Sequence, residues 1–239
     1  MTITLDNYES FRISVTMGQH EVNFFAFNGL PREEVATQIR EMQPFFDRMP
    51  PVHALGIAPI FLLVGRPSGG SGGGTYPDLT RLRARNEANR ARNDAAWGAP
   101  YDVLEAAIAA YGRHDGGRRL HVIPLERWQR PARATTVIHE CAHGVDHKFH
   151  LHRRRHPHDP LRPGPLFAVS DFPTQLPGQA CGHGSALNRA VVNAYVSMTM
   201  GFRGVSTAMR RQIINNFRNS DAFINVQDSW WQGRFPGLI

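Results

Sequence analysis

The stretch His139-Glu140-Cys141-Ala142-His143-Gly144-Val145-Asp146-His147 contains the pattern H-E-x-x-H. Residues four positions apart lie one above the other on the same face of an α-helix. His139 and His143 can therefore reach a single metal ion, and Glu140 beside them can accept a proton from a water molecule. The stretch predicts a helix that carries two metal ligands and a general base.

The rest of this segment fits a helix packed into a protein core. Apolar residues recur at helical spacing on the side away from the two histidines, at Val137, Ile138, Cys141, Ala142, Val145 and Phe149. Such a stripe buries one face of a helix and leaves the other face for polar groups. The two cysteines of the chain do not make a disulfide framework. Because Cys141 lies on the apolar side of the helix, we expect it to be a buried thiol.

Residues 118–125 read as a short strand, and a connection containing Pro131 leads from them into the H-E-x-x-H helix. A strand followed closely by such a helix is the core arrangement of zinc-dependent peptidases. The sequence therefore predicts Zn²⁺ as the cofactor and a protein or peptide as the substrate.

A catalytic zinc usually takes three protein ligands and one water molecule. The chain has no glutamate after Glu140. His147 lies two turns from His139 and cannot easily reach the same ion on a straight helix. The preferred third ligand is His183, in a glycine-flanked loop, followed by Asp171 and then Cys181.

The chain has 239 residues, a formal net charge of +7 and 41% hydrophobic residues. This composition supports a real core, and no apolar run is long enough to cross a membrane. The start lacks a signal-peptide pattern, so we expect a cytoplasmic protein, or one exported without a cleaved signal and possibly delivered into a target cell. Arginine-rich runs at residues 81–92 and 152–156 attract phosphate, but no nucleic-acid-reading motif accompanies them.

Other segments predict a mixed α and β chain. Residues 11–27 alternate around Gly18 as a β-hairpin, Pro31 opens a helix through about Asp47, and residues 57–64 suit a buried strand. Further helices are expected at 186–200 and 210–217, followed by an aromatic end that packs on the core.

The chain resembles the zinc-peptidase catalytic domain of the anthrax lethal factor type, which recurs in bacterial toxins and effectors. The resemblance covers roughly residues 52–230 and rests on the segments His139–Asp146, Gly73–Pro77, Asn193–Tyr195 and Ala222–Asn225. It implies a zincin fold, zinc ligands at His139 and His143, a base at Glu140 and a supporting role for Asp146.

The family's downstream glutamate ligand has no counterpart here, since Arg189 and Asn193 occupy the matching helix positions. The region just before that helix, where the family has a tyrosine that stabilises the transition state, holds Cys181 and His183. His183 is therefore a candidate for oxyanion stabilisation as well as for metal binding, and Tyr76 and Tyr195 are alternatives for the oxyanion role.

The resulting expectation is an α+β, zincin-like fold: a small mixed sheet, an H-E-x-x-H helix and a C-terminal helical subdomain. Residues 1–50 would form an N-terminal hairpin and helix packed on a catalytic domain at 51–239. The expected function is zinc-dependent peptide hydrolysis. If the chain is an effector, the substrate would be a host target protein. The alternatives are a catalytically degenerate zincin that acts as a binding protein, and a basic nucleic-acid-binding protein.

Overall fold

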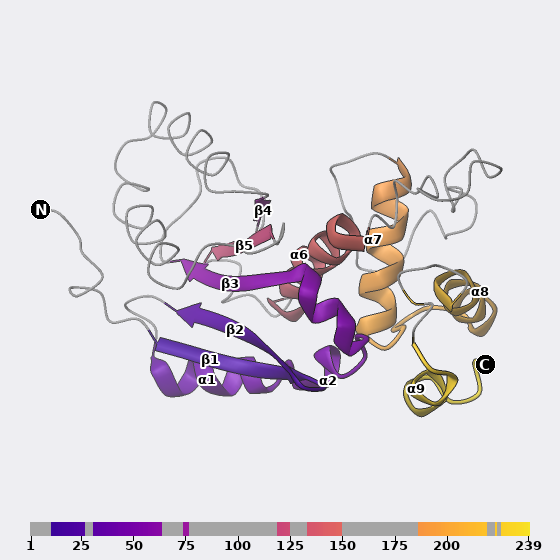
Figure 1. Cartoon of the computed structure of the whole chain (residues 1–239), viewed down its shortest axis with the longest axis horizontal. Helices are drawn as coiled ribbons and strands as arrows, with labels where there is room; N and C mark the ends of the chain where they lie inside the picture. The colour runs from indigo at the N-terminus through magenta and orange to yellow at the C-terminus, as the bar shows by residue number, and fades with distance from the viewer. Residues whose placement is uncertain are drawn as a thin grey trace, which may run out of the picture.

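The computed structural model of the chain describes residues 11–26, 31–63, 74–76, 119–124, 133–149, 186–218, 223 and 226–239. These residues form an α+β structure in which a mixed sheet lies beside a group of helices (Figure 1). The strands are β1 (Phe11–Met17), β2 (His20–Ala26), β3 (Ile57–Leu63), β4 (Gly74–Tyr76) and β5 (Arg119–Pro124). The helices are α1 (Arg32–Arg40), α2 (Gln43–Phe46), α6 (Arg133–Phe149), α7 (Ala186–Thr199), α8 (Thr207–Arg218) and α9 (Asp228–Arg234), with a 3₁₀ helix η2 at Pro51–Gly56.

The sheet has five strands in the order β1-β2-β3-β5-β4. Its two outer pairs are antiparallel, whereas β2–β3 and β3–β5 are parallel. The predicted hairpin is confirmed, and Gly18 adopts a φ of 62° in its turn, a conformation that glycine reaches without steric cost. Because β2 pairs with β3, the N-terminal hairpin belongs to the same sheet as the strands that precede the H-E-x-x-H helix.

One side chain of α2 pairs with the outer edge of β1 at Thr16. The Gln43 amide nitrogen donates to the Thr16 carbonyl at 2.8 Å, and the Thr16 backbone N–H donates back to Gln43 Oε1 at 3.0 Å. Two neighbouring backbone groups of the edge strand are thereby satisfied within the chain.

The helix expected from Pro31 to about Asp47 is interrupted: α1 ends at Arg40 and α2 begins at Gln43. Pro44 gives a physical reason for the break. It has no N–H to donate to the carbonyl of Arg40, so a continuous α-helix would lose that hydrogen bond. The backbone instead tightens, with the Met42 N–H bonded to the carbonyl of Ile39.

One apolar core joins the sheet to the helices. Alternate hairpin residues Val15, Met17, Val22, Phe24 and Ala26 belong to it, as expected for one face of a sheet. The core also includes these buried helix residues: Val35, Ile39 and Phe46 of α1 and α2, Val137, Ile138, Cys141, Ala142 and Val145 of α6, and Val191, Ala194 and Met198 of α7. The apolar stripe predicted for α6 is therefore the face that enters the core.

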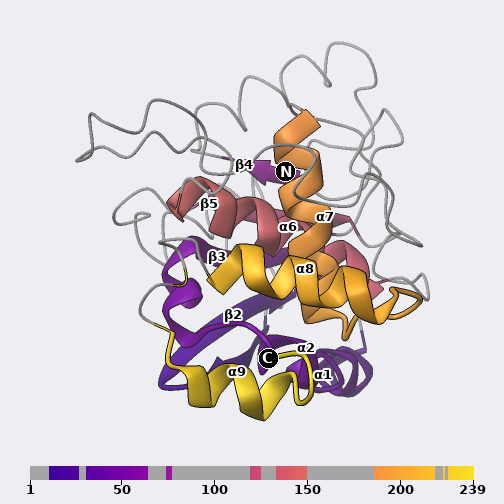
Figure 2. The same ribbon diagram turned by 90° about the vertical axis from the view of Figure 1, so that its right-hand side faces the viewer.

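The C-terminal helices gather on the side of α7 away from the sheet, with α8 across α7 and α9 close to α2 (Figure 2). Arg234 of α9 donates to the backbone carbonyl of Asp47 at 2.7 Å, which ties the chain end to the N-terminal part. The predicted aromatic packing is confirmed by Phe223 and Trp231, which are both buried. Helix α9 and the 3₁₀ helix η2 have no counterpart in the sequence prediction. Among the described helices, none is long and apolar enough to span a lipid bilayer.

Candidate metal site

The two histidines of the H-E-x-x-H pattern meet on α6. His139 Nε2 and His143 Nε2 lie 3.1 Å apart, and the two rings stand at 81° with their centroids 4.7 Å apart. His143 is buried and His139 is half-buried, so the pair sits at the boundary between the core and the surface. The two imidazole nitrogens thus lie close together on α6, and their binding of one shared ion stays a prediction.

The separation of the two nitrogens fits a shared zinc ion. Zinc binds imidazole nitrogen at about 2.0–2.1 Å in tetrahedral geometry, which places two such nitrogens about 3.3 Å from each other. The 3.1 Å separation is close to this value, although it also suits a hydrogen bond in which one imidazole N–H donates to the other ring. The 3.1 Å separation therefore places two imidazole nitrogens close enough to bind one divalent ion.

Glu140 lies next to His139 on α6, and its side chain is buried with 3% exposure. Its charge acts on its neighbour: burial raises the pKa of the Cys141 thiol, and the Glu140 carboxylate raises it further. Cys141 is a free, buried thiol, as predicted, and its raised pKa keeps it protonated at neutral pH. Cys141 is therefore an inert core residue of the helix.

Asp146 follows His143 by three residues and is 2% exposed. Its Oδ2 accepts a hydrogen bond from the Asn188 side-chain amide of α7 at 2.6 Å. Residues three apart on a helix are neighbours on one face, so Asp146 lies on the histidine side of α6. Sequence reasoning gave Asp146 a supporting role but missed Asn188, whose signal is a polar residue in the apolar stripe of a buried helix.

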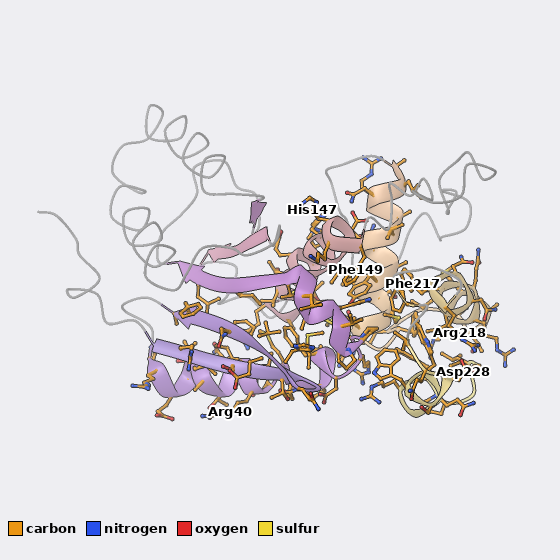
Figure 3. The ribbon with its side chains drawn as sticks, viewed as in Figure 1. Arg40, His147, Phe149, Phe217, Arg218 and Asp228 are labelled. Atoms are coloured by element: carbon orange, nitrogen blue, oxygen red, sulfur yellow. The ribbon has the colours of Figure 1, made fainter. Side chains whose placement is uncertain are left out.

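A second buried histidine supports α6 from its other side. His53 of η2 is fully buried and its Nδ1 lies 2.8 Å from the Tyr195 hydroxyl of α7. Its ring packs against Phe149 at the end of α6, against Tyr195 and against Phe223. Phe149 is labelled in Figure 3. Tyr195 is thus a buried residue of the core, and its hydroxyl is bonded to His53.

A glycine in η2 sets how closely the 3₁₀ helix approaches α6. A methyl group at Gly56 would lie 3.1 Å from Val145 Cα, 3.2 Å from the Gly144 carbonyl oxygen and 3.0 Å from Lys148 Cβ. Two of these atoms are backbone and cannot swing aside. Gly56 therefore fixes the position of the helix that carries the histidines.

The three candidates for the third ligand, His183, Asp171 and Cys181, lie outside the described residues, as does the side chain of Tyr76. Within the described parts of the chain, no group of three or more His, Cys, Asp or Glu side chains is placed to hold a metal ion. On the helix that follows, Arg189 is half-buried and Asn193 is buried with 8% exposure. Asn193 Oδ1 has no hydrogen-bond donor among the residues that the structure describes.

Comparisons with protein-family models, with curated proteins and with solved structures found no match to this chain.

Proposed function

We propose that the protein is a zinc-dependent metallopeptidase with a zincin-like fold. The observation that carries this proposal is the convergence of His139 Nε2 and His143 Nε2 at 3.1 Å on one helix, in which Glu140 directly follows His139. The supporting observations are the mixed sheet that precedes α6 and the buried Asp146 on the histidine side of the helix.

In this proposal His139 and His143 hold the ion, and His183 is the preferred third protein ligand. Bound zinc supplies Lewis acidity toward a water molecule and toward the scissile carbonyl of a peptide. Two neutral imidazoles leave most of the positive charge of the ion available for this role.

Glu140 performs the proton transfers. Its carboxylate accepts a proton from the attacking water, whose oxygen forms a bond to the carbonyl carbon of the peptide. The same proton then passes to the nitrogen of the leaving amine as the carbon–nitrogen bond breaks. Burial of Glu140 excludes competing solvent and strengthens its interaction with the developing charges.

The test combines metal analysis with one conservative variant. The purified protein should contain one zinc per chain, and Glu140→Gln should retain the zinc while losing peptide cleavage by about 100-fold or more. The assay is cleavage of a mixed peptide library, followed by mass spectrometry, with protein treated by a chelator and then given zinc again as the control.

Two outcomes would contradict the proposal. Full cleavage activity in Glu140→Gln would remove the general base from the mechanism. A wild-type protein that takes up no zinc would point instead to a zincin-like binding protein, and the search would turn to its partners.

A further inference from the structure

We propose that Asn188 is a positioning residue of the metal site, which acts on the histidines through Asp146. This inference rests on the zinc site proposed above. It assigns to α7 the task of fixing the carboxylate that lies on the histidine side of α6.

The hydrogen bond between the two residues is short and buried. Asn188 Nδ2 lies 2.6 Å from Asp146 Oδ2, and the two side chains are 8% and 2% exposed. A hydrogen bond to an ionised acceptor is shorter and stronger than a neutral one, and a buried carboxylate depends on such donors. Because Asn188 comes from a different helix, the packing of α7 on α6 determines how the carboxylate is held.

The position of Asp146 relates this bond to the histidines. Asp146 stands one turn beyond His143 on the same face of α6, with His139 one turn before His143 on that face. Carboxylates near metal-bound imidazoles orient the rings and raise their basicity, and loss of such a group lowers metal affinity by about 10–100-fold. A side chain that restricts the carboxylate should therefore influence zinc binding without contacting zinc.

The chain offers a matched control on the same helix. Asn193 is also an asparagine of α7 and is also 8% exposed, but its Oδ1 accepts no hydrogen bond from any described residue. Replacing either asparagine with alanine removes the same atoms from a buried helix. Only Asn188→Ala removes the donor to Asp146.

The experiment measures zinc affinity by competition with a chromophoric chelator, and unfolding of the metal-free protein by urea. We expect Asn188→Ala to weaken zinc binding by about 10-fold or more and Asn193→Ala to change it by less than about 3-fold. Equal effects of the two alanine variants, or unchanged zinc affinity in Asn188→Ala, would overturn the inference.

An exchange variant separates positioning from simple packing. The double variant Asp146→Asn with Asn188→Asp restores a carboxylate–amide pair but moves the carboxylate to α7. We expect it to regain the stability that Asn188→Ala loses, while its zinc affinity stays about 10-fold below that of the wild type. Recovery of full zinc affinity in the exchange variant would show a purely structural bond and overturn the inference.

Failure of the proposed function has a different signature. A wild-type protein that binds no zinc would overturn both the zinc site and the role of Asn188. Zinc binding in the wild type, with the affinity unaffected by Asn188→Ala, would overturn the role of Asn188 alone.

Discussion

Histidine side chains lie on both sides of helix α6, and their ring nitrogens have different partners on the two sides. On one side, His139 Nε2 and His143 Nε2 converge on each other at 3.1 Å. On the other side, His53 Nδ1 meets the Tyr195 hydroxyl at 2.8 Å inside a group of aromatic rings. Burial of a histidine is therefore uninformative by itself. The partners of the ring nitrogens mark His53 as a packing residue and leave His139 and His143 as the proposed ligands.

The largest expected effect comes from removing a converging ring. His143→Ala should weaken zinc binding by more than about 100-fold, because one of the two proposed imidazole ligands is lost. With a chelator present to keep the protein metal-free, His143→Ala should lower the unfolding free energy by less than His53→Ala does. Competition with a chelator measures the affinity, and a zinc affinity equal to that of the wild type would remove His143 from the site.

Replacement of His53, on the other side of α6, should reduce the stability of the fold. His53→Ala should lower the unfolding free energy by about 3 kcal/mol, since it leaves a cavity and an unpaired Tyr195 hydroxyl. Urea unfolding measures the change, and the exposed His20 provides the control, with an expected change within about 0.5 kcal/mol on replacement by alanine. Equal effects of the two variants would show that His53 is not a structural residue.

The contact between η2 and α6 can be tested through its glycine. Gly56→Ala should cost about 1–3 kcal/mol, because the added methyl group meets backbone atoms of α6 at 3.1–3.2 Å. Gly233→Ala is the control: a methyl group there meets nothing within 4 Å, and alanine in α9 should stabilise by about 0.5–1 kcal/mol. Thermal unfolding of both variants measures the two changes. Equal effects of the two variants would show that the close approach of Gly56 to α6 does not limit its side chain.

The smallest expected effect is that of the Tyr195 hydroxyl. Tyr195→Phe should cost about 1 kcal/mol at neutral pH, because His53 loses its hydroxyl partner. Burial raises the pKa of Tyr195 well above its ordinary value, and the nearby Cys141 raises it further. As the pH rises, Tyr195 therefore ionises in the unfolded chain before it ionises in the folded protein. Its contribution to stability is fully present below about pH 10 and is lost as the pH rises further.

The measurement for this variant is urea unfolding at several pH values between neutral pH and about pH 11. The wild type should lose stability more steeply than Tyr195→Phe above about pH 10. Identical slopes would mean that Tyr195 does not contribute to the alkaline loss of stability.

The parts of the fold that local patterns specify could be predicted from the sequence. The hairpin follows from alternation around Gly18, and α6 follows from the spacing of His139, His143 and the apolar stripe. The break between α1 and α2 depends on Pro44, which lies inside an otherwise continuous amphipathic pattern. The sequence of α9 predicts only an aromatic packing segment, because the Trp230-Trp231 pair dominates its composition.

Contacts between distant residues could not be predicted in the same way. Asn188 and Asp146 are separated by 42 positions, and His53 and Tyr195 by 142. No local periodicity relates such residues, because the packing of whole elements brings them together. The H-E-x-x-H pattern is the opposite case, since a single turn of helix supplies its geometry.

The bond between Gln43 and Thr16 has a consequence for how this protein behaves at high concentration. An uncovered edge strand is a template on which another chain can add a strand, and repetition of this step leads to aggregation. The amide of Gln43 mimics one peptide unit of such an incoming strand and occupies the N–H and C=O of Thr16 itself. An incoming strand would therefore have to displace Gln43 before it could pair with β1 at Thr16.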